Sequence, residues 1–143
     1  MQTKRDHIAR RIARWVLAGL YLAAGVLHLL VPGPFLTITP DWVPFPAGVV
    51  RLTGVAEIAG AMGLMIPRLR KAAGWGLAAY AVCVFPANIK HAIDSLSQAH
   101  PMLGWSYHAP RLLLQPVIVW WALWCSGVTD WPFRRPGWRS GRP

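Results

Sequence analysis

Four apolar runs divide the chain, and each has about the length of a membrane-spanning helix. They cover residues 12–31, 47–66, 72–89 and 111–128. A helix needs about 20 apolar residues to cross the hydrocarbon core of a bilayer. No water is present there to satisfy backbone polar groups, so each run must be helical. We therefore predict an all-α integral membrane protein, a four-helix bundle that occupies residues 12–128.

The overall composition fits this assignment. Of the 143 residues, 55% are hydrophobic, 14% are charged and nine are tryptophan, which is typical of membrane proteins rather than of soluble domains. The net charge of +10 would suit a nucleic-acid partner, but such a partner usually contacts a basic face of a soluble fold. Here most basic residues lie in clusters between apolar runs, so we expect the lipid bilayer as a partner and no nucleic acid.

The basic clusters predict the orientation of the bundle. Arginine and lysine are concentrated in residues 1–14, 67–71 and 134–142, whereas residues 32–46 contain neither. Positive residues stay on the cytoplasmic side of a membrane. Both termini are therefore expected inside the cell and the two longer loops outside, in a bacterial-type cytoplasmic (inner) membrane.

The two ends of the chain follow from that orientation. The N-terminal run has the general shape of a signal peptide, but it is long, lacks a clear A-x-A-like site and precedes three further apolar runs. We expect it to remain as the first span, after a basic cytoplasmic segment at residues 1–11. Residues 129–143 are basic and rich in Pro and Gly, and we expect a disordered cytoplasmic tail near anionic lipid headgroups.

Each run carries polar side chains, and in this topology they all fall in the outer half of the bilayer. An ionisable group within a span is costly to bury and usually faces a bundle interior or water, so it marks a functional site. Glu57 is the strongest case, because nothing near it in the sequence explains it. We predict a ligand-binding pocket formed by His28, Glu57, Asn88, His91, Arg111 and Gln115.

Simpler roles exist for several polar residues. Lys90 and Arg51 have side chains long enough to reach the membrane surface, and we leave Lys90 out of the site. His28 and His91 could form hydrogen bonds within the outer interface only. Arg111 begins its helix at that interface and could bind a lipid phosphate, although Gln115 one turn below it favours a pocket.

Packing between the spans is expected to depend on small residues and on one proline. In lipid, helices approach closely where Gly and Ala lie at the interface, and Gly19, Gly60 and Gly76 are candidates. Pro86 should kink the third span and free the carbonyl of Val82, which Asn88 could satisfy without touching a ligand. The proline-rich aromatic segment 31–46 could lie in the interface or cover the pocket.

Four motifs in order carry a family resemblance. They are GVLHLLVPGPFLTITPDWVP, TGVAEIAGAMGLMIPRLRKAAG, FPANIKHA and RLLLQPVIVWWALW. Together they resemble the small four-helix membrane proteins of the DoxX-like family and, more distantly, MauE-type proteins, over about residues 12–127. The resemblance implies the four-helix fold and an association with thiosulfate:quinone oxidoreductase subunits, sulfur and thiol stress, or methylamine dehydrogenase maturation. It supplies no set of catalytic residues.

Thiol chemistry is disfavoured by the cysteines. Cys83 and Cys125 form no C-x-x-C pair and are expected at different depths, too far apart for a disulfide. The chain also lacks a glycine-rich phosphate loop and the H-E-x-x-H and G-x-S-x-G motifs. No metal site and no catalytic residue are predicted.

Two classes of function remain. One is a redox-associated subunit, without catalysis of its own, that binds a quinone headgroup through His28 or Arg111 while Glu57 exchanges protons. A haem ligated by His28 and His91 is a variant that we do not expect. The other class is a scaffold, a maturation partner or a small-solute carrier. A redox partner subunit or a homo-oligomer would be the protein partner.

Overall fold

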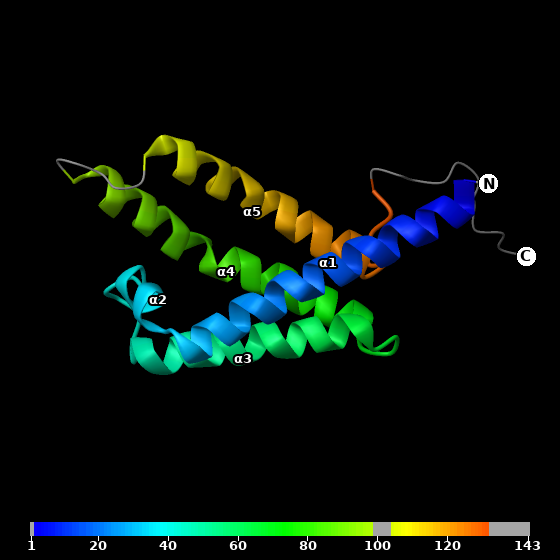
Figure 1. The fold of residues 1–143 in the computed structure, drawn as a ribbon, viewed down its shortest axis with the longest axis horizontal. Helices are drawn as coiled ribbons and strands as arrows, with labels where there is room; N and C mark the ends of the chain where they lie inside the picture. Colours follow the sequence, from blue (N-terminus) through cyan, green and yellow to red (C-terminus); the bar gives the residue numbers. More distant parts are fainter. Residues whose placement is uncertain (1, 99–103, 132–143) are drawn as a thin grey trace, which may run out of the picture.

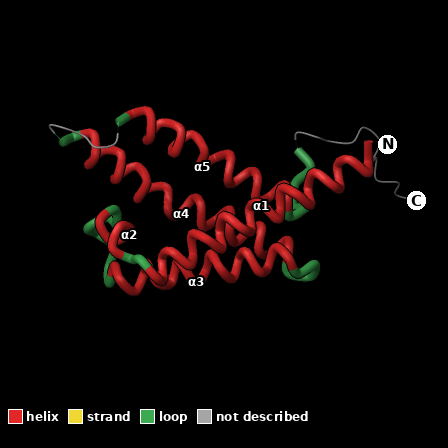
Figure 2. Tube along the Cα trace, viewed as in Figure 1, coloured by secondary structure: helices red, strands yellow, loops and turns green. Residues whose placement is uncertain are grey.

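The computed structural model describes residues 2–98 and 104–131 of the chain, and the regular structure within them is helical (Figure 2). Four long helices and one short one make up this part of the chain, so the prediction of an all-α fold is confirmed. In chain order they are α1 (Gln2–Leu30), α2 (Gly33–Thr37), α3 (Pro46–Met65), α4 (Arg70–Leu96) and α5 (Trp105–Cys125).

Three helices of the described residues are long and apolar enough to cross a membrane. They are the Asp6–Leu30 part of α1, the whole of α3 and the whole of α4. This is the pattern of a multi-pass membrane protein. The fourth predicted span is a helix, α5, but it is not among the three. Its 21 residues include an arginine, a glutamine, a histidine and two prolines, which lower its mean hydropathy.

The helices are longer than the apolar runs predicted. α1 begins at Gln2 rather than at residue 12, so the described part of the basic N-terminal segment is helical. α4 continues to Leu96 rather than ending at residue 89, and α5 begins at Trp105 rather than at 111. Hydropathy marks only the apolar part of a helix, whereas backbone hydrogen bonding continues into polar residues. Residues 132–143, most of the predicted disordered tail, lie outside the described residues.

The apolar core of the bundle gathers where α1 crosses α5 (Figure 1). Leu17, Leu64 and Leu77 are each at most 2% exposed there and pack with Ala122 and Cys125. Because these residues come from four helices, they hold the two hairpins, α1 with α3 and α4 with α5, together at this place. We call this part of the bundle the closed end.

Hydrogen bonds reinforce the closed end. Arg14 Nε donates to the carbonyl of Cys125 at 3.0 Å, and Trp121 Nε1 donates to the carbonyl of Ala13 at 3.1 Å. Both bonds join α1 to α5. Arg70 Nε donates to the carbonyl of Leu64 at 3.2 Å, near the end of α3. A cation near the last carbonyls of a helix interacts favourably with its dipole, so Arg14 and Arg70 also stabilise the ends of α5 and α3.

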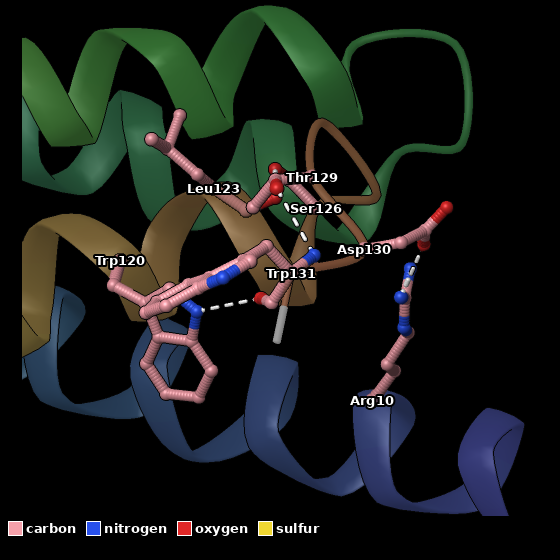
Figure 3. A network of polar contacts seen from close by, with 7 residues as sticks. All are labelled: Arg10, Trp120, Leu123, Ser126, Thr129, Asp130 and Trp131. Carbon is pink, nitrogen blue, oxygen red and sulfur yellow. Dashed lines mark hydrogen bonds and ion pairs between the residues drawn. The ribbon is translucent and has the colours of Figure 1, made fainter. Parts of the chain in front are cut away.

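The segment after α5 folds back beside the closed end (Figure 3). Asp130 forms an ion pair with Arg10 of α1. The indole nitrogen of Trp120 donates to the carbonyl of Trp131 at 2.9 Å, and the backbone N–H of Trp131 donates to the Thr129 hydroxyl at 3.2 Å. These contacts attach the last described residues to both α1 and α5.

Glycines allow close contact between helices, but only some of those predicted. A Cβ atom on Gly25 would lie 2.6 Å from the carbonyl oxygen of Gly54, so α1 and α3 meet backbone to backbone. Gly60 packs against a leucine of α4, as predicted. Gly19 and Gly76 instead face open space. That part of the prediction was wrong, because a small residue shows where helices can approach but not which face of the helix is buried.

Candidate ligand-binding site

A cavity of about 670 Å³ lies beyond the closed end. There α1 and α5 diverge (Figure 1). The cavity is lined by residues of both helical hairpins. Side chains from α1, α3, α4 and α5 line it, together with residues of α2 and the loop that follows, within 35–43. Most of these side chains are apolar. We call this part of the bundle the open end.

The structure brings five of the six predicted site residues to the wall of this cavity. They fall into two groups. His28 of α1 and Glu57 of α3 form one, which we call the acidic group. Asn88 of α4 with Arg111 and Gln115 of α5 form the other, the basic group. Their role in binding a ligand stays a prediction.

The acidic group depends on the glycine contact between α1 and α3. A Cβ atom on Gly54 would lie only 2.8 Å from the Cβ of His28, so no larger residue fits beside the histidine. His28 Nδ1 consequently lies 3.0 Å from Glu57 Oε2, and it also lies 2.8 Å from the carbonyl of Ala24. The Tyr80 hydroxyl approaches Glu57 from α4.

The buried carboxyl group of Glu57 has an incomplete set of partners. Its side chain is 5% exposed, and Oε2 has no well-formed hydrogen bond within the described residues. A single proton on His28 Nδ1 must serve both the Ala24 carbonyl and this oxygen. Buried polar atoms are normally hydrogen-bonded, and an exception needs an explanation. The hydrogen bonding of this carboxyl group is therefore incomplete within the described residues.

The loop between α1 and α3 covers the acidic group. The ring of Phe35 in α2 stacks on His28 with centroids 3.7 Å apart and planes inclined by 24°. Pro40 is buried and lines the cavity with Trp42, although most of the Trp42 side chain is exposed. Segment 31–46 was predicted either to lie in the membrane interface or to cover the pocket. Its residues within 35–43 line the cavity, as a cover would. The exposed Trp42 and Phe45 remain suited to a membrane interface.

The basic group is a chain of hydrogen bonds between α4 and α5. Arg111 Nη2 donates to Asn88 Oδ1 at 2.7 Å, and Asn88 Nδ2 donates to Gln115 Oε1 at 3.1 Å. The Gln115 amide in turn donates to the backbone carbonyl of Ala81. Each side chain orients the next, so the arginine is held at the cavity wall by partners that are all uncharged.

The predicted defect at Pro86 has a different arrangement. α4 continues through Pro86 as one helix. The side-chain donor goes to the carbonyl of Ala81 rather than to that of Val82, and it comes from Gln115 rather than from Asn88. Asn88 is instead held between Arg111 and Gln115. The sequence could place a proline but could not show which neighbouring helix supplies the compensating donor.

The remaining predicted residue, His91, lies outside the cavity lining. Its ring contacts His108 and Tyr107 of α5, with centroids 5.0 Å and 6.4 Å away. Three residues beyond Asn88 are almost one helical turn, which places His91 farther toward the end of α4. His28 and His91 therefore contact different partners, and nothing in the geometry pairs them around a haem.

Two cationic side chains considered in the sequence also lie elsewhere. Lys90 pairs with Asp94 one turn along α4. Arg51 is exposed on α3 and does not line the cavity.

Both cysteines are free, with Cys83 at the cavity and Cys125 in the closed end.

The predicted set of site residues does not include two polar residues, Tyr80 and His108. Tyr80 lines the cavity and approaches Glu57, but a tyrosine in an apolar run resembles an ordinary packing residue. His108 is 1% exposed, and neither ring nitrogen has a hydrogen-bond partner within the described residues. Its position three residues before Arg111 placed it on the same helical face, which was the available signal.

Comparison with known proteins gives a family but no function. Residues 17–126 match the model of a domain of unknown function, DUF8561. No curated protein and no solved structure matches the chain.

The predicted membership of the DoxX-like family was wrong, because the family match is to DUF8561 and not to DoxX. Four apolar runs and a proline-rich segment between the first two describe a type of membrane topology, and a topology does not identify a family. The match covers most of the chain, which therefore belongs to the DUF8561 family.

Proposed function

We propose that this protein binds a small lipid-soluble molecule with a polar headgroup in the cavity at the open end. In this proposal both termini lie inside a bacterial-type cytoplasmic membrane, because Arg10, Arg14 and Arg70 lie at the closed end and positive residues stay cytoplasmic. The open end then lies in the outer half of the bilayer.

One observation carries the proposal: the cavity walls are mostly apolar, and the histidine, carboxyl, amide and guanidinium side chains on them are gathered in the acidic and basic groups. Small-molecule sites are concave, mostly apolar and roughly 300–1,000 Å³ in volume, with a few polar groups that orient the ligand. The cavity has about 670 Å³ and fits this description. A packing role alone would not require empty space between the acidic and basic groups.

The same arrangement supports access from the lipid. The hydrogen bonds between α1 and α5 among the described residues lie at the closed end. Toward the open end the two helices separate (Figure 1). We propose that a molecule dissolved in the bilayer enters the cavity from the side where these two helices diverge, a route that suits an apolar ligand. A quinone is one such molecule, but without the DoxX relationship no redox role is proposed.

The test is to fill the cavity and to ask whether a bound molecule is lost. Ala24 lines the cavity, whereas its neighbour Ala23 is exposed on the outside of α1. We expect Ala24→Phe to reduce the amount of a small molecule that co-purifies in mild detergent, measured per chain by mass spectrometry. Ala23→Phe adds the same side chain outside the cavity and should match the parent protein. Equal amounts of the same molecules in all three samples, with none lost in Ala24→Phe, would contradict the proposal.

A second candidate is a scaffold without a ligand, because the basic group joins α4 to α5 by hydrogen bonds. Such bonds in a bilayer contribute about 0.6 kcal/mol each on average. If packing is the main role, Arg111→Ala should lower the midpoint of thermal unfolding in detergent and leave the bound molecules unchanged. If ligand binding is the main role, the same variant should lose ligand while its unfolding midpoint without ligand stays near that of the parent.

A further inference from the structure

Arg111 is a cation at the cavity wall, and none of the described residues forms an ion pair with it. Within the described residues its hydrogen bond is to the side-chain oxygen of Asn88, which is uncharged. A guanidinium has five N–H donors, so most of its hydrogen-bonding capacity is open to another partner.

The five acidic residues of the chain do not supply an anion for Arg111. All of them lie in the described residues. Asp130 is in an ion pair with Arg10 and Asp94 in one with Lys90, and the carboxyl group of Glu57 lies against the ring of His28. Of the remaining two, Asp6 is in the first turns of α1, and Asp41 is exposed in the loop before α3.

The groups around Arg111 do not substitute for an anion. Tyr107 offers only the face of its ring, 5.9 Å from the guanidinium carbon. Asn88 and Gln115 are uncharged amides. His91 is close enough to interact electrostatically with Arg111, but a histidine is either neutral or positively charged and so cannot act as the anion. A partly buried cation that lacks a counter-charge is costly within a membrane bundle. The acidic group differs, because its carboxyl group already faces a histidine.

We propose that the cavity ligand is an amphiphile with an anionic oxygen headgroup, a carboxylate or a phosphate, which pairs with Arg111. Its apolar chain then lies along the cavity toward Leu17 and Ile118, at the closed end. Arginine suits such headgroups because its planar fork can form two parallel hydrogen bonds to them. This inference rests on the proposed function and names the class of ligand.

The position of Arg111 supports a headgroup at that place. Besides the main cavity, Arg111 lines a second cavity of about 530 Å³ together with Ser106 and Tyr107 of the first turn of α5. Arg111 therefore lies on a wall that the main cavity shares with a groove reaching the first turn of α5. An amphiphile whose headgroup pairs with Arg111 has its charge near the start of α5 and its chain in the main cavity.

The test compares three probes of equal chain length on the purified, delipidated full chain: hexadecanoate, hexadecyl phosphate and the uncharged hexadecanol. Binding is measured at alkaline pH from the tryptophan fluorescence. We expect the parent protein to bind at least one of the two acids roughly tenfold or more tighter than the alcohol, as for a hydrogen bond to a charged group. The tighter of the two acids identifies the headgroup as carboxylate or phosphate.

Variants assign the difference to Arg111. Arg111→Gln should bind acid and alcohol alike, and Arg111→Lys should retain part of the preference for the acid. Arg51→Gln removes an exposed cation outside the cavity and should keep the full preference. An equal loss in Arg51→Gln would overturn the inference, because general surface charge would then explain the binding.

Two further outcomes separate this inference from the proposed function. If the parent binds the acids and the alcohol equally and Ala24→Phe weakens all three, the cavity binds ligands but the acidic headgroup is wrong. If no probe binds in a manner sensitive to Ala24→Phe, both proposals fail. Far-ultraviolet circular dichroism of each variant confirms that the helices are retained.

Discussion

The two ends of this bundle are built from different interactions. At the closed end, apolar side chains from four helices fill the interior, and two hydrogen bonds join α1 to α5. At the open end, the α1–α3 hairpin and the α4–α5 hairpin line a cavity between them, and each hairpin carries one of the two polar groups. Packed side chains fill the interior of the closed end, whereas the interior of the open end contains a cavity.

This difference shows how a small bundle can hold both a stable core and a binding site. Helices that diverge lose contact area with every turn, so one end must supply most of the packing energy. Here the leucine-rich core of the closed end does so, and it leaves the open end free to keep polar groups and empty volume. Stability and ligand binding should therefore respond to mutations at different ends of the same helices.

The largest effect is expected from a cavity in the closed end. Leu64 of α3 is 0% exposed in the core of the bundle. Leu64→Ala removes packing contacts, and the neighbouring side chains cannot move far enough to fill the resulting cavity. We expect a loss of about 2–5 kcal/mol in the free energy of unfolding, measured by denaturant titration in detergent. Leu52 of the same helix is 67% exposed, so Leu52→Ala serves as the control. Equal losses in both variants would contradict the assignment of the core to the closed end.

A smaller effect should follow from separating α1 and α3 at the open end. Gly25→Ala places a methyl group 2.6 Å from the carbonyl oxygen of Gly54, and backbone atoms must move to accept it. Overpacking of this kind costs about 1–3 kcal/mol. The variant should also weaken ligand binding, because His28 moves away from Glu57. Gly19→Ala faces open space on the same helix and should leave both stability and binding unchanged.

The smallest effect is expected at the surface of the closed end. The ion pair between Arg10 and Asp130 is exposed on the aspartate side, where 70% of the side chain is accessible. Asp130→Asn should lower the free energy of unfolding by at most about 1 kcal/mol. The difference from the parent should shrink at high ionic strength, where such pairs are screened. A loss as large as that of Leu64→Ala would show that charge, not packing, holds this end together.

Much of the architecture could be predicted from residue patterns. Runs of apolar residues predicted the long helices, because backbone groups in lipid must be hydrogen-bonded within the helix. The rarity of ionisable residues in those runs singled out Glu57 and Arg111. Helix ends were predicted poorly, since α1 and α4 both continue into polar residues. The family was also predicted wrongly, because topological patterns are shared by unrelated membrane proteins.

The arrangement of the site was less predictable. Similar depth in the membrane placed His28 and His91 in one predicted pocket, yet His28 lines the cavity and His91 packs against α5. Depth is one coordinate, whereas contact also depends on rotation about the helix axis and on which helix lies opposite. For the same reason, the contact between Tyr80 of α4 and the carboxyl group of Glu57 in α3 was not predicted.

The sequence by itself determined the helical class, the candidate membrane spans and the few polar residues that such spans contain, because these follow from the local cost of placing backbone and charge in lipid. Only the tertiary structure decided that α1 and α3 touch through Gly25 and Gly54, that the helices diverge around a cavity, and that Glu57 faces a histidine while Arg111 faces only neutral partners. These features depend on the relative rotation and crossing of helices, which side chains distant in sequence settle together.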